Sequence, residues 1–143
     1  MRLLKATLVA LLLCAAPVAT AAADALATTD ATAVRVARTG TVDAGGRAVV
    51  DLAVVCPVEG TIDGLAMTFE QHRRGQVTQG YTDLDSFAIP CSPDGVHMQL
   101  ALEVFTDVPF GPGRIVVTES IACGVSGCAT LATGQSTILH RTR

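Results

Sequence analysis

The sequence predicts an all-β fold, a Greek-key immunoglobulin-like β-sandwich of about seven to nine strands, from three observations. Short segments in which every second residue is apolar recur along the chain, separated by turns rich in Gly and Pro. No stretch after residue 23 keeps the 3.6-residue apolar spacing of a helix. Four cysteines after residue 23 suit two disulfides in a small exported domain.

The first 23 residues have the three parts of a secretory signal peptide. Residues 1–5 carry Arg and Lys, residues 6–16 are apolar, and residues 19–23 are small and end in an Ala-x-Ala pattern. The apolar part is too short to span a membrane. We therefore expect cleavage after Ala23, secretion into the extracellular space, and no membrane span in the mature chain.

The mature chain is expected to form one acidic domain. Removal of the signal peptide, with its Arg and Lys, would leave 120 of the 143 residues and a formal net charge near −5 in place of −3. An acidic chain without a basic cluster is a poor candidate for binding nucleic acid or an anionic membrane. We expect a monomer, with a protein or a component of the cell envelope as its partner.

Cys56, Cys91, Cys123 and Cys128 remain after cleavage, and four cysteines allow three pairings. We favour Cys56–Cys91, which would join two central strands, and Cys123–Cys128. The second pair flanks a four-residue loop containing glycine, and opposite positions of such a hairpin bring Cβ atoms within disulfide reach. Zinc is the competing interpretation, but the cysteine spacing is not that of a zinc finger, and export favours oxidation.

The first half of the domain is expected to hold an edge strand and a central strand. Residues 24–32 are small and polar, so we predict a flexible lead-in to a sandwich domain at 33–143. Residues 33–38 alternate weakly, as in an edge strand, and residues 39–46 contain three glycines, as in a turn. Residues 47–56 have one wholly apolar side and one partly polar side, which is typical of a central strand.

The next strand is predicted at residues 61–73, and Gly64 indicates a bulge in it. An Arg-Gly pair then offers a turn into a strand at 76–81. Residues 82–90 are predicted to be a surface connection with a short strand near 87–89.

Residues 96–106 show the clearest alternation in the chain, and we expect this strand and the strand at 47–56 to be central strands tied together by Cys56 and Cys91. The apolar side of the strand is Val96, Met98, Leu100, Leu102 and Val104. Further elements are a rigid Pro-Gly loop at 107–113 and strands at 114–123, 128–133 and 135–141.

The layout of signal peptide, Gly-rich turn, V-x-L-x-V-x-C strand and C-terminal cysteine pair resembles small exported immunoglobulin-like proteins of high-GC Gram-positive bacteria, which have no known function. One lysine and no asparagine in the chain agree with a GC-rich genome. The C-x4-C hairpin is also similar to that of the neocarzinostatin-like chromoproteins. That second resemblance implies a cleft for an apolar small molecule. The chain lacks the tryptophan that packs against the disulfide of antibody domains.

No catalytic residue and no cofactor are expected. His72, His97 and His140 fall on different predicted strands, and none has a partner at metal-ligand spacing. His97 lies on the polar side of the strand predicted at 96–106, which indicates a solvated side chain. The alternative is that His97 acts as a general base near a serine and an aspartate. The chain has no G-x-S-x-G motif, so a secreted hydrolase is the least favoured function.

No metal site is expected either. The carboxylates of Asp83 and Asp85 fall on one side of an extended backbone and suggest a calcium site, but the other positions of a calcium loop are missing. A polar surface turn is the favoured interpretation. Glu70 and Glu103 would complete several possible carboxylate pairs for glycoside hydrolysis, but the sequence does not set their separation. Few aromatic residues are present, which disfavours sugar binding.

Two groups of residues are candidates for contact with a partner. His72, Arg73 and Arg74 form a basic tip on an acidic domain, either a solvated strand end or a contact for an acidic partner. Phe105 and Phe110 are either covered by a neighbouring loop or exposed as a joint apolar patch. The leading hypothesis is therefore a secreted, non-enzymatic binding or structural module. A carrier with an apolar cleft is the alternative.

Overall fold

The computed structural model describes residues 26–143, except for the side chains of Ser86 and Phe87. The predicted signal peptide at residues 1–23 lies outside the described residues. Every regular secondary-structure element between residues 26 and 143 is a β-strand, which confirms the all-β fold. The eight strands are β1 (Ala33–Val42), β2 (Ala48–Val55), β3 (Gly60–Arg73), β4 (Gln76–Cys91), β5 (Val96–Val104), β6 (Gly113–Gly124), β7 (Gly127–Thr130) and β8 (Ser136–Arg141).

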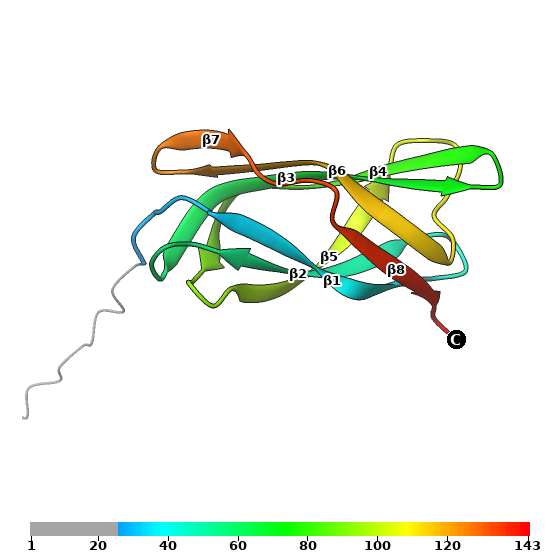
Figure 1. Ribbon diagram of the computed structural model, residues 1–143, viewed down its shortest axis with the longest axis horizontal. Helices are drawn as coiled ribbons and strands as arrows, with labels where there is room; N and C mark the ends of the chain where they lie inside the picture. The colour runs from blue at the N-terminus through cyan, green and yellow to red at the C-terminus, as the bar shows by residue number, and fades with distance from the viewer. Residues whose placement is uncertain (1–25) are drawn as a thin grey trace, which may run out of the picture.

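The strands are hydrogen-bonded in the order β3-β4-β5-β2-β1-β8-β6-β7. Because β3 also pairs with β6, the first seven strands of this order close into a ring, and β7 extends from β6 outside it. Only the β1–β8 pair is parallel among the strand pairs of residues 26–143. Figure 1 shows β3, β6 and β7 along the upper side of the molecule, and β1 and β2 along the lower side.

Strands are present at both positions predicted to be central, and these strands, β2 and β5, are antiparallel neighbours from Ala48 opposite Leu102 to Val54 opposite Val96. Their apolar sides point into the core, where Leu52 and Leu102 are almost fully buried, while His97 and Glu103 on the other side of β5 are exposed. The alternation of residue types therefore sets which side of each strand meets the interior.

Both predicted disulfides are present. Cys56 and Cys91 lie in the core with their Cα atoms 5.6 Å apart. The bridge joins the residue after β2 to the last residue of β4, and not to the strand at 96–106 as predicted. Cys123 and Cys128 are directly opposite partners in the β6–β7 hairpin. The first bridge fastens the interior, whereas the second fastens a hairpin whose β7 residues are all exposed.

The predicted surface connection at residues 82–90 is wrong, because β4 continues unbroken to Cys91. Thr82 and Ile89 are buried in this segment, and it remains paired with β3 across an irregularity between Ile62 and Gly64, where the sequence predicted a bulge. Alternating burial and cross-strand pairing therefore outweigh the polar composition of the segment. The predicted turn at 39–46 also begins late, since β1 extends to Val42.

The predicted flexible lead-in at 24–32 is tied to the domain from residue 27 onward. The Thr29 amide donates a hydrogen bond to the Thr61 carbonyl at 2.8 Å, and the Thr61 amide donates to the Ala27 carbonyl at 3.0 Å. A Cβ atom at Gly60 would lie 2.6 Å from that carbonyl oxygen, so glycine gives the segment room to approach. Further along, the Asp30 carboxylate accepts hydrogen bonds from the amide and hydroxyl of Ser126.

Candidate functional site

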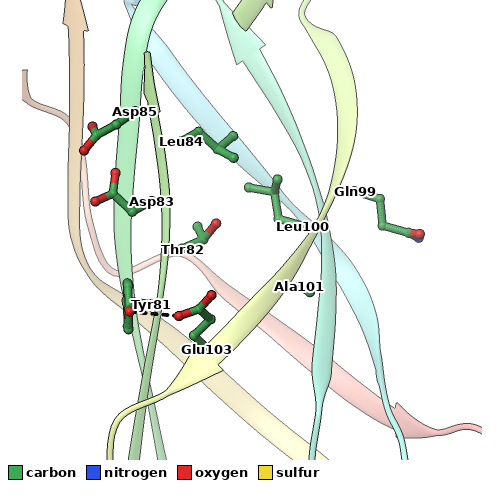
Figure 2. Close-up of a pocket in the computed structure, with 9 residues that line it drawn as sticks. All are labelled: Tyr81, Thr82, Asp83, Leu84, Asp85, Gln99, Leu100, Ala101 and Glu103. Carbon is green, nitrogen blue, oxygen red and sulfur yellow. Dashed lines mark hydrogen bonds between the residues drawn. The ribbon is translucent and has the colours of Figure 1, made fainter. Parts of the chain in front are cut away.

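A cleft opens where β4 and β5 separate. Among the residues that the structure describes, the two strands pair at two positions, Gly80 opposite Val104 and Tyr81 opposite Glu103, and then diverge. The space between them has a volume of about 480 Å³. Figure 2 shows the residues that line it: Tyr81, Thr82, Asp83, Leu84, Asp85, Gln99, Leu100, Ala101 and Glu103.

The side chains along the cleft alternate between apolar and acidic character. Leu84 on β4 and Leu100 on β5 point toward one another across the gap, and Leu100 is nearly buried. The carboxylates of Asp83, Asp85 and Glu103 lie on the solvent side of the same two strands, where all three residues are exposed. The cleft therefore has an apolar floor and a negatively charged rim.

Hydrogen bonds and charge order the acidic rim. Tyr81 Oη donates a hydrogen bond of 2.8 Å to Glu103 Oε2, and this bond, followed by the charge of Glu103, raises the pKa of Tyr81. Partial loss of hydration and then the neighbouring Asp85 carboxylate raise the pKa of Asp83. The rim thus holds negative charges that lack a cationic partner among the residues lining the cleft, and a positively charged ligand would relieve their repulsion.

This charge arrangement gives Asp83→Asn a pH-dependent effect on stability. Because the pKa of Asp83 is raised in the folded state, its ionised form destabilises the fold above that pKa, and the penalty vanishes below the ordinary value of 3.8. The substitution should therefore raise the midpoint of thermal unfolding at neutral pH. It should leave the midpoint unchanged in acid below pH 3.8. Thermal unfolding followed by circular dichroism over this pH range measures both.

Asp30→Asn is the matched control, and its effect has the opposite sign. Hydrogen bonds from the side chain and then the backbone of Ser126 lower the pKa of Asp30. Its ionised form therefore stabilises the fold above the ordinary value of 3.8, and this contribution is lost as the pH falls through the lowered pKa. The control should lower the midpoint at neutral pH. Midpoints that move in the same direction for both variants would contradict this assignment of charges.

An exposed aromatic pair lies beside the closed end of the cleft. The rings of Tyr81 and Phe105 have centroids 5.8 Å apart and are tilted by 47°. Phe105 keeps 53% of its surface exposed, and its amide donates a hydrogen bond to the Gln79 carbonyl, which holds the residue beside β4. Aromatic side chains of this kind are enriched where proteins contact partners.

The structure separates the two phenylalanines predicted as a joint patch. Phe110 is only 2% exposed and belongs to the core, so its predicted role as a partner contact is wrong. Its ring lies over Gly80, where a Cβ atom would come within 2.5 Å of Phe110 Cε2. The loop around Phe110 is held by buried Gln71, whose side chain exchanges two hydrogen bonds with the backbone of Gly111, at 2.8 and 2.9 Å.

The predicted basic tip lies at the β3–β4 turn, where Arg74 has a positive φ of 52°. His72 contacts the carboxylate of Glu70, and Arg73 lies over Gly111, where a Cβ atom would clash with its guanidinium. A hydrogen bond from Gln79, followed by the contact with His72, lowers the pKa of Glu70. Two side chains of the basic tip, His72 and Arg73, therefore contact other residues of the same domain.

His97 and His140 are exposed residues on β5 and β8. Within residues 26–143, no group of three or more His, Cys, Asp or Glu side chains could hold a metal ion. Nor does this part of the chain contain a helix long and apolar enough to cross a membrane.

Sequence reasoning missed the cleft because it treated residues 82–90 as a connection. The signal was present in the alternation of Tyr81, Asp83 and Asp85 with Thr82 and Leu84, which is the pattern of a strand with one polar side. The divergence of β4 from β5 had no counterpart in the sequence, because it depends on which strands pair.

No protein-family model and no curated protein sequence matches the chain. Among solved structures, the chain is similar to a cohesin module from the family 33 glycoside hydrolase of Clostridium perfringens ATCC13124. The TM-score is 0.44 and the sequence identity is 9%, over 80% of this chain and 99% of that module. This likeness is too distant to transfer a ligand or a partner.

Proposed function

We propose that the chain is a secreted, non-enzymatic binding domain that contacts a protein or a component of the cell envelope through the β4–β5 cleft. The observation that carries the proposal is the cleft itself, with its apolar floor, its acidic rim and the exposed Tyr81–Phe105 pair beside it. Apolar and aromatic surface surrounded by polar groups is typical of protein-binding sites.

The proposal includes an immunoglobulin-like Greek-key sandwich as the scaffold. Pairing of β2 with β5 and of β3 with β6 supports it, because each pair joins strands that are not consecutive in the chain. In addition, β1 pairs with β2 and, in its second half, with β8, as the first strand of such a sandwich does when it bridges two sheets.

An extracellular location is supported by the two disulfides and by the predicted signal peptide at residues 1–23. Disulfides form and persist in oxidising compartments and are rare in the cytosol. A cleft residue therefore meets a partner outside the cytoplasm, in the medium or at the envelope.

Capture experiments with matched variants test this function. The purified, oxidised protein is immobilised and exposed to secreted and envelope fractions, alongside the variant Tyr81→Ala/Phe105→Ala and the control Val125→Ala/Ile138→Ala. The control removes exposed apolar side chains that do not line the cleft. We expect a partner that the wild type and the control capture and that the cleft variant loses by about tenfold or more.

Equal capture by all three proteins would show that the cleft is not the contact surface. Capture of nothing above background would overturn the binding role as a whole. The carrier alternative has less support, since the cleft lies between β4 and β5 rather than beside the β6–β7 hairpin, and carboxylates form its rim.

A further inference from the structure

The edge of β5 that faces β4 is open along most of its length. On its other edge, β5 pairs with β2 from Val96 to Leu102. On the cleft side, pairing with β4 stops after Tyr81 opposite Glu103, so residues 96–102 have no strand partner there within the described part of the chain. A row of unpaired backbone N–H and C=O groups is a template for another extended chain.

The opposite wall of the cleft is also a strand edge. On one side β4 pairs with β3 from Gln76 to Cys91, with an irregularity between Ile62 and Gly64 of β3. On the other side, the ladder with β5 among the described residues consists of Gly80 and Tyr81. An extended segment entering the cleft would therefore lie between two strand edges, with its side chains alternating between the interior and the solvent.

The two faces of such a segment would meet different chemistry. Its inward side chains would lie against Leu84 and Leu100, which favours apolar residues. Its outward side chains would lie beside Asp83 and Asp85 on β4, and Glu103 adds a third carboxylate at the closed end of the cleft, which favours Lys or Arg. The period of two along β4 and β5 thus specifies a period of two in the ligand.

We propose that the cleft binds an extended segment of a partner protein in which apolar residues alternate with Lys or Arg, and that this segment adds to β5 as a strand along residues 99–102. The inference rests on the proposed binding function and names the chemistry of the partner. Strand addition supplies main-chain hydrogen bonds, and the alternating side chains supply specificity. At the closed end, the exposed rings of Tyr81 and Phe105 offer a further contact for a cation.

A fluorescein-labelled peptide of alternating Val and Lys is the probe, and fluorescence anisotropy with the purified, oxidised protein is the measurement. A second peptide has the same composition with the valines and lysines in two blocks. A third keeps the alternation but carries N-methyl groups on alternate residues, which removes hydrogen-bond donors along one edge. We expect the first peptide to bind, and the other two to bind about tenfold more weakly or not at all.

Charge-neutralising variants test the acidic rim. Asp83→Asn/Asp85→Asn should weaken binding of the alternating peptide about fivefold at low salt, with a smaller difference at high salt. The control Glu59→Gln/Glu119→Gln removes the same charge from exposed residues that do not line the cleft, and it should leave the affinity within about twofold. Hydrogen exchange should show new protection of amides in residues 99–102 when the peptide is bound.

Equal binding of the alternating and block peptides would overturn strand addition, because charge alone would then explain the affinity. Protection elsewhere, or association of the protein with a second copy of itself through the same cleft, would also overturn it. A third outcome is that the alternating peptide does not bind, although the Tyr81→Ala/Phe105→Ala variant captures less of the partner than the wild type does. That outcome would reject the proposed ligand chemistry and would leave the proposed binding function supported.

Discussion

Phe110→Ala is expected to lower the free energy of unfolding by about 3–5 kcal/mol, the usual cost of deleting a buried aromatic ring. Phe110 is 2% exposed and packs over Gly80, so the substitution leaves a cavity beside the β3–β4 and β4–β5 pairs. The lost volume cannot be refilled easily, because Pro109 and Gly111 flank the residue and the Gln71 side chain holds the loop. Chemical denaturation of the oxidised protein measures the change.

Phe105→Ala is the matched control, since it removes the same ring from a neighbouring position. Phe105 is 53% exposed and contacts Tyr81 at the surface, so its loss should cost less than about 1 kcal/mol. The two phenylalanines therefore differ in role, one in stability and the other in surface contact. Equal losses of stability for the two variants would contradict this division.

The same pair shows where sequence reasoning reaches its limit. Both residues follow apolar positions near a Pro-Gly loop, and the sequence allows each to be covered or exposed. The ring of Phe110 packs over Gly80, which lies 30 positions earlier in the chain. Alternation does not predict where the strand that carries Gly80 lies in the sheet. Local patterns report the side of a strand that is apolar, whereas a loop residue is buried or exposed according to tertiary contacts.

The scaffold itself could be predicted further than the site. Alternation, glycine and cysteine spacing are local signals, and they predicted the strands β2 and β5, the bulge near Gly64 and both disulfides. The pairing of β2 with β5 was not predicted. The β4–β5 cleft arises instead from two strands that separate after a short pairing. No residue at the point of separation predicts it, because Tyr81 and Glu103 are residue types that are common in strands.

Loss of the Cys56–Cys91 disulfide is expected to lower the free energy of unfolding by roughly 4 kcal/mol, because a bridge across 35 residues strongly restricts the unfolded chain. Cys56→Ala/Cys91→Ala makes this change, and it also leaves space in the core, where both sulfur atoms are buried. A single domain of this size commonly has a stability of about 5–15 kcal/mol, so the variant could be largely unfolded at the temperature at which the wild type is stable.

Cys123→Ala/Cys128→Ala supplies the comparison, because its bridge spans only 5 residues and fastens an exposed hairpin. The loop-entropy model assigns this bridge roughly 2 kcal/mol, and a frayed β7 would expose little apolar surface. Denaturation of both variants and of the reduced wild type should therefore rank the proteins, with the hairpin variant nearest the oxidised wild type. The reverse order would mean that the β6–β7 hairpin, rather than the bridge from β2 to β4, stabilises the fold. In that case the cleft between β4 and β5 would lose its rigid support at the Cys91 end of β4, and a preformed binding edge on β5 would no longer be expected.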